Sequence, residues 1–364
     1  MIQPKPSVQG LPVYQPGKPL EEVQRELGLT DVIKLASNEN PFGCSPKISA
    51  ALQQISDYYH QYPEATAPLL NEKLAKHLNI DPDQIIFGNG SDEIIQMICR
   101  TFLEPEDEAI MADITFPVYK TEVRIEGGVP VTVPLKDGTH DLKAMKEAIT
   151  DKTKIVWICN PNNPTGTFVD HNTLQSFLQE IPKHVVVVLD EAYVEYVTDP
   201  TFPNSLALLA EYPQLIILRT FSKIYGLAAF RIGYGIAHPE IIGELHRVRP
   251  PFNTSRLAQQ AALTALDDQD FVAHCKEVNA KERERLIQQI EQWDLHYFPT
   301  QGNFILFDTG APSEEAYQYL LERGVIVRAG LAYPTYIRVT VGTPEQNHRF
   351  IRVFSEFLQQ KQAD

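Results

Sequence analysis

Short apolar runs alternate with helix-length amphipathic segments through the middle of the chain. The run at 185–189 consists of four valines and a leucine, and such continuous aliphatic content is typical of a strand buried on both faces of a sheet. The alternation predicts an α/β fold with a mostly parallel sheet flanked by helices. We predict seven strands, at 85–87, 109–112, 129–133, 155–159, 185–189, 215–219 and 231–237.

The pattern changes near residue 257. A long helical pattern extends from there to about 293, and a smaller unit follows with strands at 304–307, 325–327 and 337–341 and helices at 313–323 and 344–360. We therefore predict three parts: an N-terminal arm over 1–30, extended around its prolines, a large domain over 31–256, and a small α/β C-terminal domain over 257–364 that begins with the connecting helix 257–293.

Composition and charge narrow the classes of function. The formal net charge of −15 disfavours a general nucleic-acid binder, since a phosphate backbone would be repelled. An anionic ligand must therefore be held by a few groups inside a pocket. The run 185–189 is far too short to span a bilayer, and residues 1–10 lack the apolar stretch of a secretory signal, so we expect a cytoplasmic protein. The four cysteines and the histidines show no metal-ligand spacing, so we expect no metal site.

Two loops that follow predicted strands carry polar motifs. The first, Gly88-Asn89-Gly90-Ser91, leads into a helix that begins with two acidic residues, and a glycine turn at a helix N-terminus can bind phosphate through backbone N–H groups. Such turns also occur for purely structural reasons. The second, at 160–166, joins asparagine and proline in a loop at the carboxyl end of a strand, where ligands bind in open α/β sheets, although those residues also suit an ordinary turn.

Two further strands end in ionisable residues. The strand at 185–189 runs directly into Asp190, with Tyr193 three residues on. A strand-terminal aspartate can cap a turn, or it can be a buried anion that pairs with a cationic ligand. Lys223 follows another strand and is flanked by Phe, Ile and Tyr residues. Most lysines are solvated, but one in a partly apolar pocket loses basicity and becomes a nucleophile toward carbonyl compounds.

Together the four clusters resemble the fold-type I pyridoxal-5′-phosphate (PLP) enzymes, and among these the class II aminotransferases. The resemblance covers nearly the whole chain in order, spacing and strand context. It implies that Lys223 binds the cofactor as a Schiff base and shuttles the proton, and that Asp190 pairs with the pyridinium nitrogen. A buried carboxylate at that position keeps the ring nitrogen protonated, which the cofactor needs to act as an electron sink.

The same resemblance implies further cofactor contacts. Asn163 and the catalytic Tyr193 would hydrogen-bond the ring 3′-oxygen, and Phe116 would stack on the ring face. The cofactor phosphate would be held by backbone amides at the first turn of the helix, by a hydroxyl and by a guanidinium, from Ser91, Asp92, Glu93, Ser222 and Arg231. Tyr62 matches a tyrosine that reaches the cofactor phosphate of a neighbouring subunit, which implies a homodimer with shared active sites.

Two arginines in strand contexts point to an anionic substrate. Arg328 and Arg338 can form structural ion pairs with some of the 47 acidic residues. In the family, Arg338 matches the arginine that binds the carboxylate of the amino donor, and Arg328 matches a second one that suits a substrate phosphate. Tyr14 and Asn253 match positions near the substrate. The family members most similar in these motifs transfer the amino group of histidinol phosphate to 2-oxoglutarate, which becomes glutamate, in histidine biosynthesis.

Several alternatives remain open from the sequence. An aromatic amino-acid aminotransferase would share the lysine and the carboxylate-binding arginine, and a phosphothreonine decarboxylase would also use Arg328. A non-catalytic PLP-binding regulator usually carries an added DNA-binding domain, and this chain has no basic helical extension. A simple nucleotide-binding protein would use the glycine turn but would leave Lys223 and Asp190 unexplained.

Overall fold

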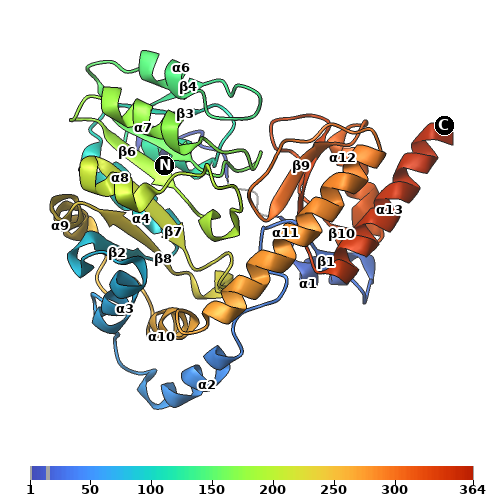
Figure 1. Cartoon of the computed structure of the whole chain (residues 1–364), viewed down its shortest axis with the longest axis horizontal. Helices are drawn as coiled ribbons and strands as arrows, with labels where there is room; N and C mark the ends of the chain where they lie inside the picture. The colour runs from blue at the N-terminus through green and yellow to red at the C-terminus, as the bar shows by residue number, and fades with distance from the viewer. Residues whose placement is uncertain (1, 14–16, 364) are drawn as a thin grey trace.

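A seven-stranded sheet organises the larger part of the protein (Figure 1). The computed structural model describes residues 2–13 and 17–363. All the strands run parallel except β8, which is antiparallel to both of its neighbours, β2 and β7. In spatial order the strands are β2 (Ile85–Gly88), β8 (Gly233–Ala237), β7 (Leu215–Thr220), β6 (Val186–Asp190), β5 (Thr153–Cys159), β3 (Glu108–Ala112) and β4 (Val129–Val133).

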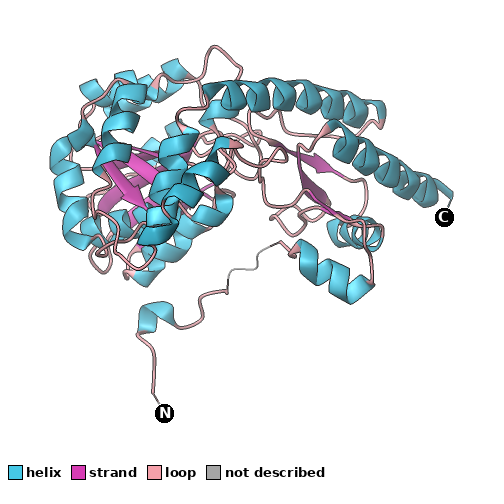
Figure 2. Ribbon diagram, turned by 90° about the horizontal axis from the view of Figure 1, so that it is seen from below, coloured by secondary structure: helices cyan, strands magenta, loops and turns pink. Residues whose placement is uncertain are grey.

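Helices cover both faces of this sheet (Figure 2). Successive strand side chains point to opposite faces, so Trp157 and Val188 belong to one apolar core while Ile158 and Leu189 belong to the other. The first core is closed by α4 (Ser91–Phe102), α5 (Val118–Ile125) and α9 (Pro239–Val248). The second is closed by α2 (Lys47–Gln54), α3 (Pro68–Leu78), α6 (Leu142–Glu147), α7 (His171–Glu180), α8 (Ser205–Glu211) and α10 (Arg256–Ala265).

A smaller α/β unit lies beside the sheet and carries the C-terminus (Figure 1). Its antiparallel pair is β9 (Phe304–Asp308) with β11 (Tyr336–Thr340), and its core also takes side chains from α11 (Gln269–Gln292), α12 (Ser313–Glu322) and α13 (Pro344–Ala363). The N-terminal segment joins this unit, because β1 (Ile33–Lys34) pairs in parallel with β10 (Val325–Ile326). The predicted division into domains at residues 31 and 257 stays a prediction.

The predicted mostly parallel α/β architecture is confirmed, and each of the ten predicted strands lies within two residues of an observed one. The helical region expected over 257–293 is interrupted between the end of α10 at Ala265 and the start of α11 at Gln269. At the break, the Asp268 carboxylate accepts hydrogen bonds from the Ser45 hydroxyl and, at 3.1 Å, from Lys47 Nζ. Aspartate favours such side-chain bonds over a helix interior, so the contact with a distant segment fixes a new helix start.

The stretch expected as an extended arm over 1–30 contains a helix, α1 (Leu20–Leu27), which begins directly after Pro19 and ends at Gly28 in the left-handed conformation. Proline before the first turn and glycine after the last are the usual helix boundaries. Among residues 2–13 and 17–363, no helix has both the length and the apolar content needed to cross a membrane.

Candidate active site

A cavity of about 260 Å³ opens at the carboxyl ends of the central parallel strands. Its wall includes Cys159, Asp190 and Thr220, the last residues of β5, β6 and β7. Parallel strands place their carboxyl ends at one edge of the sheet, which is where open α/β folds bind ligands. Residues of the smaller unit, among them Arg328 and Arg338, close the opposite side.

Asp190 presents a buried carboxylate to this cavity. Its side chain lies at the end of a wholly buried strand and is only 4% exposed. Tyr119 Oη donates to Asp190 Oδ2 at 2.5 Å, and the Ala192 N–H donates to Oδ1 at 3.2 Å. Burial raises the pKa of Asp190 to about 6, while these two hydrogen bonds oppose the rise. Both donors are neutral, so the carboxylate suits a cationic group of a ligand, which would recover the cost of its desolvation.

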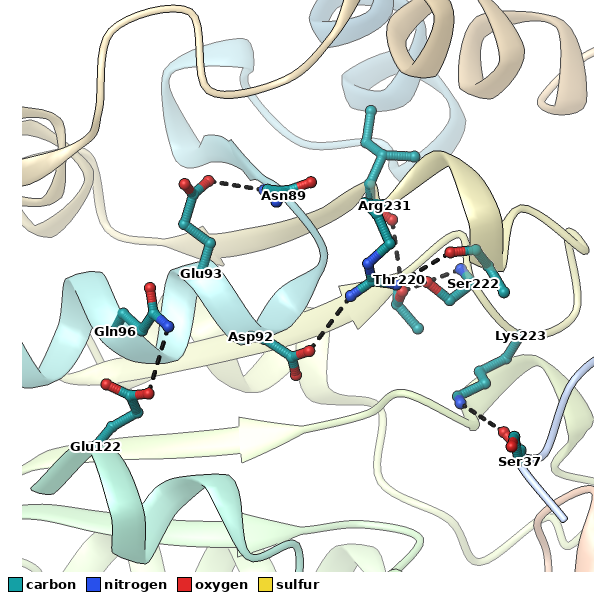
Figure 3. A network of polar contacts seen from close by, with 12 residues as sticks. Ser37, Asn89, Asp92, Glu93, Gln96, Glu122, Thr220, Ser222, Lys223 and Arg231 are labelled. Atoms are coloured by element: carbon teal, nitrogen blue, oxygen red, sulfur yellow. Dashed lines mark hydrogen bonds and ion pairs between the residues drawn. The ribbon is translucent and has the colours of Figure 1, made fainter. Parts of the chain in front are cut away.

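Lys223 reaches the same cavity from the loop after β7. Figure 3 shows its side chain directed to the backbone carbonyl of Ser37, with Nζ 3.4 Å from the oxygen. Nζ also lies 5.6 Å from the centre of the Tyr193 ring. Burial, and after it the positive charge of Arg338, lower the pKa of Lys223 to about 8. Roughly a tenth of this amine is therefore neutral at pH 7, which makes it a usable nucleophile.

The turn before α4 forms an anion cradle. Gly90 lies at the helix N-cap with φ of 77°, and a Cβ there would be 2.6 Å from Arg231 Nη2. A Cβ on Gly233 would be 2.5 Å from the Ser91 backbone nitrogen. Both glycines thus keep the space around the helix N-terminus open. Backbone N–H groups and the guanidinium converge there, as a phosphate group requires.

The side chains of the cradle are arranged partly as the sequence predicts. Arg231 Nη1 lies 3.5 Å from Ser222 Oγ, and its Nη2 is 3.3 Å from Asp92 Oδ2 (Figure 3). The Asp92 carboxylate thus turns toward the guanidinium and pairs with it. Glu93 turns away, since its Oε2 accepts the Asn89 N–H at 2.7 Å.

Arg338 occupies the side of the cavity formed by the smaller unit. It is 7% exposed, and its Nη1 donates to Asn163 Oδ1 at 2.5 Å while Nη2 donates to the Ala36 carbonyl at 2.8 Å. Arg328 is its neighbour across an antiparallel bridge, with backbone hydrogen bonds of 3.0 and 2.8 Å in the two directions. Both arginines therefore line the cavity.

Aromatic and amide groups also line the cavity. Tyr193 is buried and its Oη accepts a hydrogen bond from Asn163 Nδ2 at 3.4 Å. Burial raises the pKa of Tyr193, so the phenol is protonated and able to donate. Phe116 contributes a further wall, and its ring lies edge-on to that of Tyr119 at 5.5 Å between centroids.

Some predicted site residues lie outside this cavity. Asn253 is engaged elsewhere, because its Nδ2 donates to Glu93 Oε2 at 2.6 Å and to the Phe87 carbonyl at 3.0 Å. Tyr62 is 78% exposed and stacks on Phe252, with 4.6 Å between ring centroids. Glu93 is also absent from the cavity wall, and Tyr14 lies outside the described residues.

The sequence did not reveal every residue that contacts this site. Tyr119, which binds Asp190, lies in the first turn of α5, three positions after Phe116, and this closeness in sequence was the available signal. Ser37 and Asn38 line the cavity from the segment after β1. Their polar cluster precedes a proline, but nothing local indicates that this segment would reach the sheet.

Comparison with known proteins identifies the class. Residues 30–354 match the family described as "Aminotransferase class I and II". The chain therefore belongs to the class I and II aminotransferases, as its motifs predicted.

Individual relatives refine this placement. The chain is 53% identical over 360 residues to the histidinol-phosphate aminotransferase of Geobacillus sp. (strain WCH70), covering 98% of this chain and 99% of that protein. It is 52% identical over 363 residues to the enzyme of the same name from Geobacillus thermodenitrificans (strain NG80-2), covering 99% and 100%. Among solved structures, the histidinol-phosphate aminotransferase of Sinorhizobium meliloti in complex with pyridoxal-5′-phosphate superposes with a TM-score of 0.89 at 28% identity, over 98% of this chain and 99% of that one.

Proposed function

We propose that this protein is a PLP-dependent aminotransferase that converts histidinol phosphate and 2-oxoglutarate to imidazole-acetol phosphate and glutamate, and the reverse. The observation that carries the proposal is the convergence of Lys223 and Asp190 on one cavity. A weakly basic amine and a buried carboxylate are the two groups that an aromatic aldehyde with a ring nitrogen needs. The names of the relatives at about half identity support the same substrate.

The residues present fit the cofactor. Asp190 would pair with the protonated ring nitrogen, because its buried carboxylate has neutral donors and a raised pKa. The backbone amides of Ser91 and Asp92, with Ser222 and Arg231, would hold the phosphate in the cradle that two glycines keep open. Binding of the phosphate would draw the Arg231 guanidinium from the Asp92 carboxylate.

When bound, PLP supplies a carbonyl carbon that accepts the amino group and a ring that withdraws electrons from the substrate Cα. Lys223 would bond to that carbonyl carbon between turnovers. Its Nζ would take the proton from the substrate Cα, for which a pKa of about 8 is well matched at neutral pH. Tyr193 would donate a hydrogen bond to the ring oxygen from its buried, protonated phenol.

The two guanidinium groups would select the substrates. Arg338 would bind the carboxylate of glutamate in one half-reaction, and Arg328 with Arg338 would bind the phosphate of histidinol phosphate in the other. One cluster of cations thus serves two different anions at the same place. The carboxylate of an aromatic amino acid would be bound by Arg338, whereas the phosphate of histidinol phosphate would be bound by both arginines. We therefore favour the phosphorylated substrate over an aromatic amino acid.

The working assembly is a homodimer in the cytoplasm. Tyr62 and Phe252 form an exposed stacked pair, and Tyr59 beside them is also exposed. Exposed aromatic groups gathered in this way are typical of a protein interface. A second copy would cover them and would receive Tyr62 at its own cofactor phosphate. Sedimentation equilibrium tests the dimer, and fractionation of producing cells tests the location.

A comparison of substrates tests the proposed activity. Purified protein loaded with PLP is given histidinol phosphate, phenylalanine or phosphothreonine, each with 2-oxoglutarate, and glutamate formation is measured. The proposal requires the largest kcat/KM with histidinol phosphate. A larger value with phenylalanine would replace it by an aromatic aminotransferase, and release of carbon dioxide from phosphothreonine would replace it by a decarboxylase.

A further inference from the structure

The phenol oxygen of Tyr193 accepts hydrogen bonds from two asparagine side chains. Asn163 Nδ2 donates at 3.4 Å and Asn38 Nδ2 donates at 3.1 Å. Asn163 belongs to the loop after β5, whereas Asn38 belongs to the segment after β1, which packs against the smaller unit. Asn38 is 1% exposed and adopts the left-handed backbone conformation, with φ of 55°.

The direction of the Asn38 amide is fixed by Thr340 on β11. The Asn38 backbone N–H donates to Thr340 Oγ1 at 3.0 Å, and Thr340 Oγ1 in turn donates to Asn38 Oδ1 at 3.1 Å. Thr340 gives its one hydroxyl proton to Oδ1, and Nδ2 then faces the Tyr193 hydroxyl as a donor. Asn303 Nδ2 holds the Asn38 carbonyl from the same side at 3.0 Å.

The direction of the Asn163 amide is fixed by Arg338. A guanidinium has only donors, so Oδ1 of Asn163 must face Arg338 Nη1, at 2.5 Å, and Nδ2 must face Tyr193. Both amides therefore present N–H groups to the phenol oxygen, and both of its lone-pair positions are occupied. The single proton of the Tyr193 hydroxyl is left to point toward the cavity that Tyr193 lines.

We propose that Asn38 is a positioning residue that turns the Tyr193 hydroxyl into a dedicated hydrogen-bond donor toward an anionic oxygen of the ligand in the cavity. This inference rests on the proposed function, in which that oxygen is the ring oxygen of PLP. Asn38 lines the cavity, and it acts on the ring oxygen through Tyr193. Without its N–H, the phenol proton could turn away from the cavity, and the ring oxygen would lose a donor.

The test follows the visible absorption of bound PLP as a function of pH. A donor to the ring oxygen stabilises its anion and lowers the pH at which the absorption changes. In Asn38→Asp, Thr340 still has an oxygen to bond, but the other new oxygen accepts the Tyr193 proton. Asp also tolerates a positive φ. We expect the absorption midpoint to rise by about one pH unit.

A double-mutant cycle with Tyr193→Phe separates the hydrogen bond from the added charge. The negative charge that Asn38→Asp adds is present in both backgrounds. The titratable groups that face the phenol, Arg338, Lys223, Asp190 and Cys159, are also the same in both. The inference requires that Asn38→Asp shift the midpoint about one pH unit further in the wild-type background than in Tyr193→Phe. Equal shifts in the two backgrounds would overturn it.

A neutral variant guards against misfolding of the charged one. Asn38→Gly removes the amide and suits the backbone φ of 55°. We expect its midpoint to rise with Tyr193 present and to stay unchanged in Tyr193→Phe, and an unchanged midpoint with Tyr193 present would overturn the inference. A wild-type protein that shows no PLP absorption at all would instead refute the proposed function, so the two failures are distinguishable.

Discussion

Replacing Asp190 by asparagine should raise the stability of the cofactor-free protein while lowering its activity. Burial raises the pKa of Asp190 from 3.8 to about 6, so the folded state binds this proton more tightly than the unfolded state does. Stability is therefore lost as the pH rises from about 4 to about 6. Above pH 6 the free energy of unfolding is lower by about 3 kcal/mol, because each unit of pKa shift corresponds to about 1.4 kcal/mol.

Asparagine keeps the shape of the side chain but removes the charge. Its Oδ1 can accept from Tyr119, while its Nδ2 would face the Ala192 N–H that now donates to the carboxylate. The contact between these two donors would reduce the gain in stability by about 1 kcal/mol. We expect Asp190→Asn to raise the free energy of unfolding of the apoprotein by about 1–2 kcal/mol at pH 8. At pH 4 the gain should vanish and the clash should remain, because the wild-type carboxyl is then protonated.

The activity should change in the opposite direction. With PLP bound, Asp190 would pair with the ring nitrogen, and removing one partner of a buried pair costs about 3–5 kcal/mol. The expected loss in kcat is therefore roughly a hundredfold to a few thousandfold. Thermal unfolding of apoprotein at pH 4 and pH 8 and turnover at pH 8 measure both effects. Asp92→Asn, which removes a more exposed carboxylate of the same cavity, is the matched control. An Asp190→Asn protein that is destabilised at pH 8, or that keeps its turnover, would refute the reasoning.

Three further variants test other parts of the site. Lys223→Ala should lower turnover by at least about a thousandfold, because among residues 2–13 and 17–363 no other lysine lines the cavity to move the Cα proton, and added methylamine should restore part of the rate. Gly90→Ala should weaken PLP binding at least about tenfold, since the new Cβ would lie 2.6 Å from Arg231 Nη2. Turnover at saturating PLP should be largely retained. A spectroscopic titration measures the affinity for PLP, and an unchanged affinity would exclude the cradle as the phosphate site. Arg328→Gln should raise KM for histidinol phosphate about thirtyfold through loss of one charge-assisted bond, and KM for glutamate much less; equal effects on both would contradict the assigned role.

The strands were predictable because their cause is local. Continuous aliphatic runs such as 185–189 can be buried only inside a covered sheet, and the structure places each run within two residues of its prediction. The places of Asp190 and Lys223 in the cavity wall were predictable for the same reason. Asp190 directly follows such a run, Lys223 follows the run 215–219 after three residues, and the carboxyl ends of parallel strands meet.

The residues that the sequence failed to indicate depend on contacts between distant segments. The helix break at Asp268 depends on Ser45, which is 223 positions away in the chain. Asn38 meets Tyr193 across 155 positions. In each case the deciding partner is brought close only by the complete fold.

A crystal structure of the protein grown with PLP tests the central claim most directly. The account predicts continuous electron density from Lys223 Nζ to the carbonyl carbon of the cofactor, with the ring nitrogen within hydrogen-bond distance of Asp190 at the other end of the ring. Density that joins the cofactor to a different lysine, or a ring nitrogen that faces away from Asp190, would contradict it.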